Sequence, residues 1–211
     1  MKNVQVYADK LFADYPALAV IKPDFQKAFE LLRDTYTRGS KVLLCGNGGS
    51  YSDSAHFAGE LMKSFIKKRP LAASLVEKLH ARGERGARMS QQLEAALCAL
   101  PLPGNNAFAS AYLNDANPEF VYAQALLGMG RAGDTLVGFS TSGNAKNVLA
   151  AMELAKALDI HTLGISGRDG GDLKRLADVC IIVPATETYK IQEFHLPVYH
   201  TLALMLEEEF F

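Results

Sequence analysis

Cysteine is scarce in this sequence, which contains only Cys45, Cys98 and Cys180 among its 211 residues. Their number is odd, their spacing is wide and no CxxC pair occurs, so the pattern does not indicate a disulfide framework. We therefore expect three reduced thiols, most of them buried.

An excess of charge is also lacking, because 22 Lys and Arg residues balance 23 Asp and Glu residues to a net charge of -1. Such a chain has no basic field to attract nucleic acid or anionic lipid, so we expect neither partner. No apolar run reaches the length of a membrane span, and Asp9 and Asp14 interrupt the stretch where a signal peptide would need apolar residues. We expect a cytoplasmic protein.

The composition that remains is that of an ordinary globular protein, with 49% hydrophobic and 21% charged residues. A chain of this length fits one sizeable domain better than two small ones. Residues 1–211 are therefore predicted to form a single domain.

Short apolar runs alternate with helical patterns along much of the chain. The runs lie at residues 41–45, 135–140 and 161–166, and a last one ends at Pro184. Runs of this kind are typical of strands buried on both faces of a parallel sheet. The alternation predicts an α/β fold: a doubly wound parallel sheet flanked by helices in a flavodoxin-like three-layer sandwich.

Helices are also predicted at both ends. Residues 1–38 contain a helical pattern over 24–37, with Gly39 as its stop, and residues 189–211 predict a long helix interrupted by Pro197. The alternation stops between Arg69 and Asn114. We interpret residues 70–105 as a helical insertion of two short amphipathic helices and a loop, with no strand.

Two polar loops follow predicted strands. The first, GNGGS, contains Asn47, Gly48, Gly49 and Ser50 before a predicted helix, so its backbone N–H groups and the helix N-terminus can bind an anion. An ordinary glycine-rich turn is the alternative. The loop is neither GxGxxG nor a Walker A motif, which weighs against a dinucleotide or ATP.

The second loop, STSGN, presents Ser140, Thr141, Ser142 and Asn144. Parallel strands end at the same edge of a sheet, so the two loops are expected to meet in one crevice. Hydroxyl and backbone donors without a neighbouring Lys or Arg suit a sugar phosphate that is held and then released.

Four further side chains could carry chemistry. His56 and Glu60 are four residues apart on one helical face, and Gln192 and His200 lie on roughly one side of the C-terminal helix. Imidazole, carboxylate and amide groups can bind a divalent ion such as zinc, or the same groups can act as an acid and a base. A solvated polar face is the plainer alternative.

Taken together, the motifs resemble a known family. The chain contains, in this order, GNGGSYSDSAHFAGEL, STSGN, GRDGGDLKRLADVCIIVP and KIQEFHLPVYH. This combination resembles the SIS-domain phosphoheptose isomerases, which interconvert sedoheptulose 7-phosphate and D-glycero-D-manno-heptose 7-phosphate. The resemblance covers residues 25–211 apart from the insertion, and it implies a homotetramer with its active site at a subunit boundary.

The resemblance also implies roles for particular residues. Glu60 and His200 match the catalytic pair, and Asp115 matches an acidic residue near the sugar. The two loops match those that bind the substrate and its phosphate. A zinc site is implied at the residues that match the family's metal ligands: His56, Glu60, Gln192 and His200.

Two positions depart from the family pattern, because Ala145 replaces a phosphate-contacting serine and Tyr189 replaces an acidic residue. An isomerase of another sugar phosphate therefore stays an alternative. A second alternative is a non-catalytic SIS-domain regulator, of the type that binds the replication initiator. Such regulators lack the catalytic glutamate and histidine, whereas this chain has both Glu60 and His200.

Isomerisation of an aldose to a ketose passes through an enediol, so the site needs a base near C1 and C2 and a group that moves a proton between oxygens. Glu60 is the candidate base, and His200 is suited to ring opening or proton transfer because imidazole titrates near neutral pH. The sequence is compatible with Glu60 as a metal ligand, as a base or as both in turn.

Overall fold

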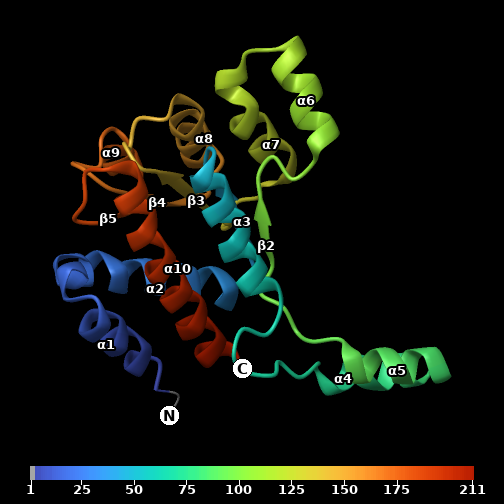
Figure 1. The fold of residues 1–211 in the computed structure, drawn as a ribbon. Helices are drawn as coiled ribbons and strands as arrows, with labels where there is room; N and C mark the ends of the chain where they lie inside the picture. The colour runs from blue at the N-terminus through green and yellow to red at the C-terminus, as the bar shows by residue number, and fades with distance from the viewer. Residues whose placement is uncertain (1–2) are drawn as a thin grey trace.

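The computed structural model describes residues 3–211 and contains one five-stranded sheet (Figure 1). All strand pairs are parallel, in the order β2-β1-β3-β4-β5. The strands are β1 (Val42–Cys45), β2 (Ala99–Pro101), β3 (Thr135–Ser140), β4 (His161–Ser166) and β5 (Val179–Ile182). The predicted bounds of β3 and β4 are confirmed. Both strands are nearly continuous buried runs, which is why the sequence identified them.

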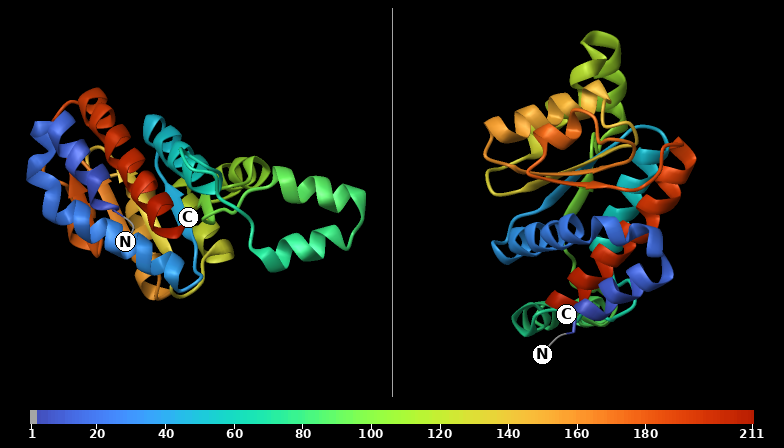
Figure 2. Two further views of the ribbon diagram at one scale, coloured as in Figure 1. Left: turned by 90° about the horizontal axis from the view of Figure 1, so that it is seen from below. Right: turned by 90° about the vertical axis from the view of Figure 1, so that its left-hand side faces the viewer.

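Helices cover both faces of the sheet, which confirms the predicted three-layer architecture (Figure 2). The elements on one face are α1 (Gln5–Asp14), the 3-10 helix η1 (Pro16–Ile21), α2 (Lys22–Thr37), α3 (Gly49–Met62) and α10 (Thr188–Phe210). The other face packs against α7 (Val121–Met129), α8 (Lys146–Ala157) and α9 (Leu173–Leu176), with α6 (Asn106–Asp115) and η2 (Pro118–Phe120) beside α7. Among these described helices, none is long and apolar enough to span a bilayer.

The C-terminal helix differs from its prediction in one respect. We expected Pro197 to interrupt it, but α10 runs without a break from Thr188 to Phe210. The face of α10 around Val198, Leu202 and Leu206 is fully buried against the sheet and its neighbours. This burial holds the helix together across the proline, whose missing N–H removes only one backbone hydrogen bond.

The insertion contains the two predicted helices, α4 (Ala73–His80) and α5 (Glu84–Gln92), which form a hairpin that projects from the body (Figures 1 and 2). We call residues 73–92 the arm. The expectation that residues 70–105 contain no strand is wrong, because β2 lies there as the edge strand beside β1. Three residues ending in Pro101 carry no alternating pattern, and the edge position tolerates a proline.

A buried ion pair joins the arm's base to the core. Arg69 and Glu207 have no exposed side-chain surface, and Nε of Arg69 lies 2.8 Å from Oε1 of Glu207. The guanidinium also donates to the backbone carbonyls of Glu60 and Leu61 at the end of α3. Burial alone would raise the pKa of Glu207, but hydrogen bonds from the Phe65 and Ile66 amides and from Arg69 lower it on balance.

Removing one partner of this pair leaves a buried charge without compensation, which typically costs about 3–5 kcal/mol. We therefore expect Arg69→Met to lower the free energy of unfolding, measured by urea denaturation, by about 3–5 kcal/mol. The exposed pair of Lys10 and Asp14 supplies the control, and Lys10→Met should change little. Equal effects of the two substitutions would contradict a structural role for the buried pair.

Candidate active site

The first predicted loop joins β1 to α3 and lies against α10. Gly48 adopts a positive φ of 55°, and α3 begins at the next residue. A Cβ atom on Gly49 would collide with the side-chain amide of Gln192. Glycine at position 49 therefore lets the start of α3 approach α10 closely and brings two predicted substrate-binding residues together.

The second predicted loop joins β3 to α8. Gly143 has a φ of 68°, and a Cβ there would overlap the backbone carbonyl of Gly170. Asn144 turns away from the first loop, because its side chain donates to the Ser142 carbonyl and accepts from the Asp172 amide. Its observed contacts hold the loop in shape.

The two loops meet, and a small cavity of about 110 Å³ lies between them. Hydroxyl groups and one amide line most of it, with one aromatic ring and one methyl group. The lining residues are Asn47, Ser50, Phe139, Ser140, Thr141, Ser142 and Ala145. Small size and a hydroxyl-rich lining fit one tetrahedral anion.

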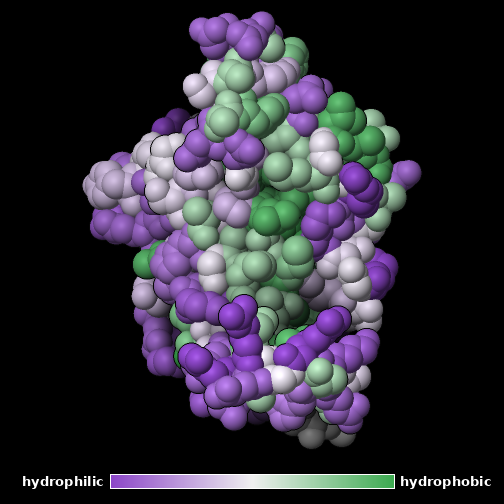
Figure 3. All heavy atoms as spheres, turned by 90° about the vertical axis from the view of Figure 1, so that its right-hand side faces the viewer, coloured by the Kyte–Doolittle hydropathy of each residue, from purple (hydrophilic) through white to green (hydrophobic). Residues whose placement is uncertain are grey.

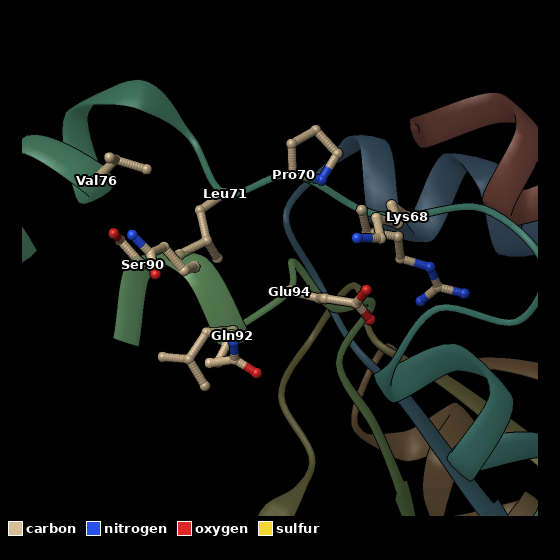
Figure 4. Close-up of a pocket in the computed structure, with 10 residues that line it drawn as sticks. Lys68, Pro70, Leu71, Val76, Ser90, Gln92 and Glu94 are labelled. Carbon is tan, nitrogen blue, oxygen red and sulfur yellow. The ribbon is translucent and has the colours of Figure 1, made fainter. Parts of the chain in front are cut away.

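A larger cavity of about 450 Å³ lies elsewhere, between the base of the arm and the body (Figure 4). Its labelled lining includes Lys68, Leu71, Ser90 and Glu94, with Glu94 opposite Lys68. None of the predicted site residues lines it. We assign the chemistry to the smaller cavity, since convergent polar groups matter more for a site than volume does.

Two residues that contact the first loop were not predicted as site residues from the sequence. Asn147, in the first turn of α8, exchanges two hydrogen bonds of 2.9 Å with Asn47. Tyr122, from α7, donates to the Gly46 carbonyl and contacts Oδ1 of Asn47 at 3.1 Å. Burial raises the pKa of Tyr122, so it stays a neutral donor. The only sequence signal for Asn147 was its position in the turn after STSGN.

The helices α3 and α10 run in the same direction, side by side (Figure 1). Gly49 lies against Gln192, and seven residues further along each helix His56 contacts Tyr199. Seven residues are close to two helical turns, so the contacts repeat on the same faces. The pairing brings together His56, Glu60 and His200 from the two helices.

Within this group, His56 is central. Its Nε2 atom lies 3.3 Å from Oε1 of Glu60 and 3.4 Å from Nε2 of His200, while Tyr199 contacts Nδ1 at 3.0 Å. Burial, and then the neighbouring His56, lower the pKa of His200 and favour its neutral form. Lys63 lies 3.3 Å from the other carboxylate oxygen of Glu60.

The fit of these residues to zinc can be tested on their spacing. Over residues 3–211, no three His, Cys, Asp or Glu side chains converge as a ready metal site. In a tetrahedral zinc site with bonds of 2.0–2.1 Å, two ligand atoms lie about 3.3 Å apart. The distances from Nε2 of His56 to Glu60 and to His200, 3.3 and 3.4 Å, match that separation. The donor types suit zinc, but the structure shows the required spacing only for the two pairs that share Nε2 of His56.

Asp115 lies apart from this group in its contacts. It is exposed at the end of α6, and its carboxylate accepts a hydrogen bond from Asn114. Tyr189 is also exposed, in the first turn of α10. The structure thus brings the loop residues together and the His/Glu groups together, but neither set contacts Asp115.

A parallel sheet whose first and third strands end in a shared, hydroxyl-lined cavity defines a class of protein. Residues 114–206 match the family model of the SIS domain. A phosphoheptose isomerase structure from Francisella tularensis has the same fold, with a TM-score of 0.75 and coverage of 96% of this chain and 94% of that one, at 24% identity.

More similar relatives define the family within this class. The chain is 36% identical over 198 residues to a phosphoheptose isomerase of Akkermansia muciniphila, covering 94% of this chain and 92% of the relative. It is 39% identical to one from Helicobacter pylori, covering 85% and 81%. A phosphoheptose isomerase structure from Neisseria gonorrhoeae aligns with a TM-score of 0.74 and 30% identity over 96% and 95% of the two chains. The chain belongs to the phosphoheptose isomerase family.

Proposed function

We propose that this protein isomerises sedoheptulose 7-phosphate to D-glycero-D-manno-heptose 7-phosphate. Family membership supports the reaction class, and one structural observation carries the assignment of the site. A hydroxyl-lined cavity for an anion lies at the start of α3, where Ser50 lines it, and His56 and Glu60 of the proton-transfer group lie further along the same helix.

The anion cavity would bind the substrate's phosphate. Ser140, Thr141 and Ser142 supply hydroxyl groups, and Ser50 does so from the opposite loop. No Lys or Arg lines the cavity, so the phosphate is held by neutral donors. Ala145 leaves one donor fewer than the family pattern supplies, and we expect weaker phosphate binding than in relatives with serine there.

The spacing along α3 suits a long sugar. His56 is seven residues beyond Gly49, which corresponds to about 10 Å along the helix. In a heptose 7-phosphate the reacting carbons lie far from the phosphate-bearing carbon, so an extended chain could reach from the cavity to His56 and Glu60. Tyr189 replaces an acidic residue of the family pattern, so a panel of ketose phosphates belongs in the assay.

Glu60 would act as the base that moves the proton between C1 and C2. Its side chain is only 13% exposed, and its helix end is held through the Arg69 contacts to the backbone. His200, kept neutral by burial, would transfer the proton between the two oxygens. A regulator would need neither group, and the presence of both favours an enzyme.

Zinc is part of this proposal, with His56, Glu60 and His200 as ligands and Gln192 as the fourth. When bound, the ion would polarise the carbonyl of the open-chain sugar. In this chain the Gln192 amide lies against Gly49, about two helical turns from His56. The geometry therefore supports His56, Glu60 and His200 as ligands, and Gln192 stays a candidate from the family resemblance alone.

Assembly into a homotetramer, with the active site near a subunit boundary, is also proposed. The apolar faces of α2 and α10 are buried within the chain, so these helices are poor candidates for the interface. The arm is a better candidate, because α4 buries no residue and Leu75 and Met89 are exposed. Two isolated helices of this length are marginal in water, so the arm needs a covering surface.

The surface beside the arm is itself apolar (Figure 3). Met62 ends α3, Leu100 lies in the neighbouring edge strand β2, and both side chains are exposed. A second copy could cover this surface with its own arm. Electrostatics also favour an arm that packs on a second copy of the chain. The arm, residues 73–92, contains four Lys and Arg against two Glu, whereas residues 105–130 around α6 and α7 contain one Asp, one Glu and no Lys or Arg.

Loss of a phosphate contact should affect binding more than turnover. Ser142→Ala is expected to raise KM for the sugar phosphate several-fold while kcat changes less, because phosphate is bound about equally in the ground and transition states. Steady-state kinetics on sedoheptulose 7-phosphate measure both constants, with Ser74→Ala on the arm as the control. An unchanged KM would exclude the STSGN loop as the phosphate site.

Loss of the base should affect turnover most. Glu60→Gln keeps the shape of the side chain but removes its basicity, so kcat should fall by at least about 100-fold while substrate binding survives. Incorporation of solvent deuterium at the substrate carbon measures the proton transfer separately from complete turnover. His200→Asn should also lower kcat, and if His200 is a zinc ligand the variant should contain less zinc by elemental analysis.

The matched control is Glu193→Gln, which makes the same change at an exposed residue of α10 outside the proposed site. It should leave kcat unaltered. If the unmodified protein binds a sugar phosphate but incorporates no deuterium into any of the ketose phosphates, the isomerase proposal fails and a regulatory role replaces it.

The assembly can be tested by multi-angle light scattering. The unmodified protein should have the mass of a tetramer at micromolar concentration, and Leu75→Glu with Met89→Glu should shift it to a smaller species. Ser74→Glu with Gln91→Glu adds the same charge at polar positions of the arm and should leave the mass unchanged. A monomeric unmodified protein would refute the assembly, and equal masses for all variants would exclude the arm from it.

A further inference from the structure

A pair of side-chain amides joins the two loops of the anion cavity. Asn47, in the loop after β1, exchanges two hydrogen bonds of 2.9 Å with Asn147 in the first turn of α8. Asn47 lines the cavity, whereas Asn147 does not. Asn147 is therefore placed to act on a bound anion through Asn47.

The orientation of both amides follows from one backbone group. The backbone N–H of Val148 lies 3.0 Å from an atom of the Asn147 amide. An N–H group can only donate, so that atom is the amide oxygen of Asn147. The Asn147 nitrogen must then donate to the oxygen of Asn47, and the Asn47 nitrogen donates back to the oxygen of Asn147. The main chain of α8 thus sets the direction of the whole pair.

The amide oxygen of Asn47 has a second neighbour. The hydroxyl of Tyr122 donates to the Gly46 carbonyl and also lies 3.1 Å from Oδ1 of Asn47, so one hydrogen is shared between two acceptors. An amide oxygen accepts two hydrogen bonds, and Asn147 and Tyr122 occupy both places. The Asn47 nitrogen keeps one N–H that Asn147 does not use. Asn47 can therefore offer the cavity a donor but no acceptor.

Two hydroxyl groups of the cavity are arranged in the same way. Oγ of Ser140 accepts from the Ala145 amide at 3.4 Å, and Oγ of Ser142 accepts from the Asn144 amide at 3.2 Å. A hydroxyl that accepts from the backbone keeps its own hydrogen for another partner. Since no Lys or Arg lines the cavity, a bound anion depends on such neutral donors and on their direction.

We propose that Asn147 is a positioning residue that fixes Asn47 as a donor to the phosphate of the substrate. This inference rests on the phosphate site of the proposed function and adds a residue behind it. Without Asn147 the Asn47 amide can turn about its last side-chain bond, because torsions of this type have broad minima. Its oxygen would then face the anion for part of the time and repel it.

Binding of inorganic phosphate tests the proposal directly. Asn147→Leu has a similar size but no polar group, and it should raise the Kd for phosphate about 10-fold, as expected for the loss of one hydrogen bond to a charged group. The Kd is obtained from the thermal unfolding midpoint measured over a phosphate titration. The control is Gln26→Leu, which removes a hydrogen-bonded amide from α2 and should leave the Kd unaltered. An unaltered Kd in Asn147→Leu would overturn the proposal.

A double substitution separates positioning from an independent effect on the fold. Asn47→Ala should weaken phosphate binding by itself. Addition of Asn147→Leu to Asn47→Ala should cause no further loss, because the residue through which Asn147 acts is already gone. Losses that add up would show that Asn147 acts without Asn47, and the positioning role would be refuted.

A milder variant provides the same test if Asn147→Leu does not fold. Asn147→Ser suits the first turn of a helix, and its single short hydroxyl cannot replace both amide hydrogen bonds. It should also weaken phosphate binding in the presence of Asn47 and not in its absence. In turnover of the sugar phosphate, either variant should raise KM more than it lowers kcat.

The unmodified protein distinguishes failure of this proposal from failure of the proposed function. If it isomerises no ketose phosphate but Asn147→Leu still weakens phosphate binding, the positioning role stands and the reaction is wrong. If it turns over the substrate and Asn147→Leu binds phosphate equally well, only the positioning role fails. If it binds no phosphate at all, the assignment of the cavity and the role of Asn147 fail together.

Discussion

The ion pair between Arg69 and Glu207 holds together parts of the chain that are far apart in sequence. Its guanidinium caps the end of α3 by binding the carbonyls of Glu60 and Leu61, and the Glu207 carboxylate accepts from the amides of residues 65–67. The two residues come from the base of the arm and from α10. The end of α3, the start of the arm and the C-terminal helix thus converge on one buried contact. The side chain of Phe211 covers it, with its ring 5.0 Å from the guanidinium.

This contact matters for chemistry because Glu60 is one of the residues it holds. Arg69 binds the backbone of Glu60, so the position of the proposed base depends on a pair more than a hundred residues apart in sequence. A buried pair is a poor source of stability compared with apolar packing, but it is specific about geometry. Here it links the end of α3 to α10 through Arg69, while buried apolar side chains of the two helices pack in the same core.

Once those helices are parallel, their contacts repeat every two turns. Gly49 meets Gln192 at the loop end, and His56 meets Tyr199 further down. The anion cavity lies beside the first contact, where Ser50 at the start of α3 lines it, and the proton-transfer residues lie at the second. The distance between the cavity and the proton-transfer residues is set by the rise of the helices. This distance suits an extended phosphorylated sugar better than a compact one.

Local patterns in the sequence identified most of the sheet and proposed the candidate residues. Continuous apolar runs identified β3 and β4, and glycine and hydroxyl residues after strands identified both loops, because buried strands and tight turns impose strong local requirements. Only the tertiary structure supplied β2, since three edge residues ending in Pro101 gain their pairing from β1 alone. The same holds for the pairing of Asn47 with Asn147, which meet because the loops that carry them follow the neighbouring strands β1 and β3. Such contacts depend on which elements lie side by side, and a local pattern carries no record of those neighbours.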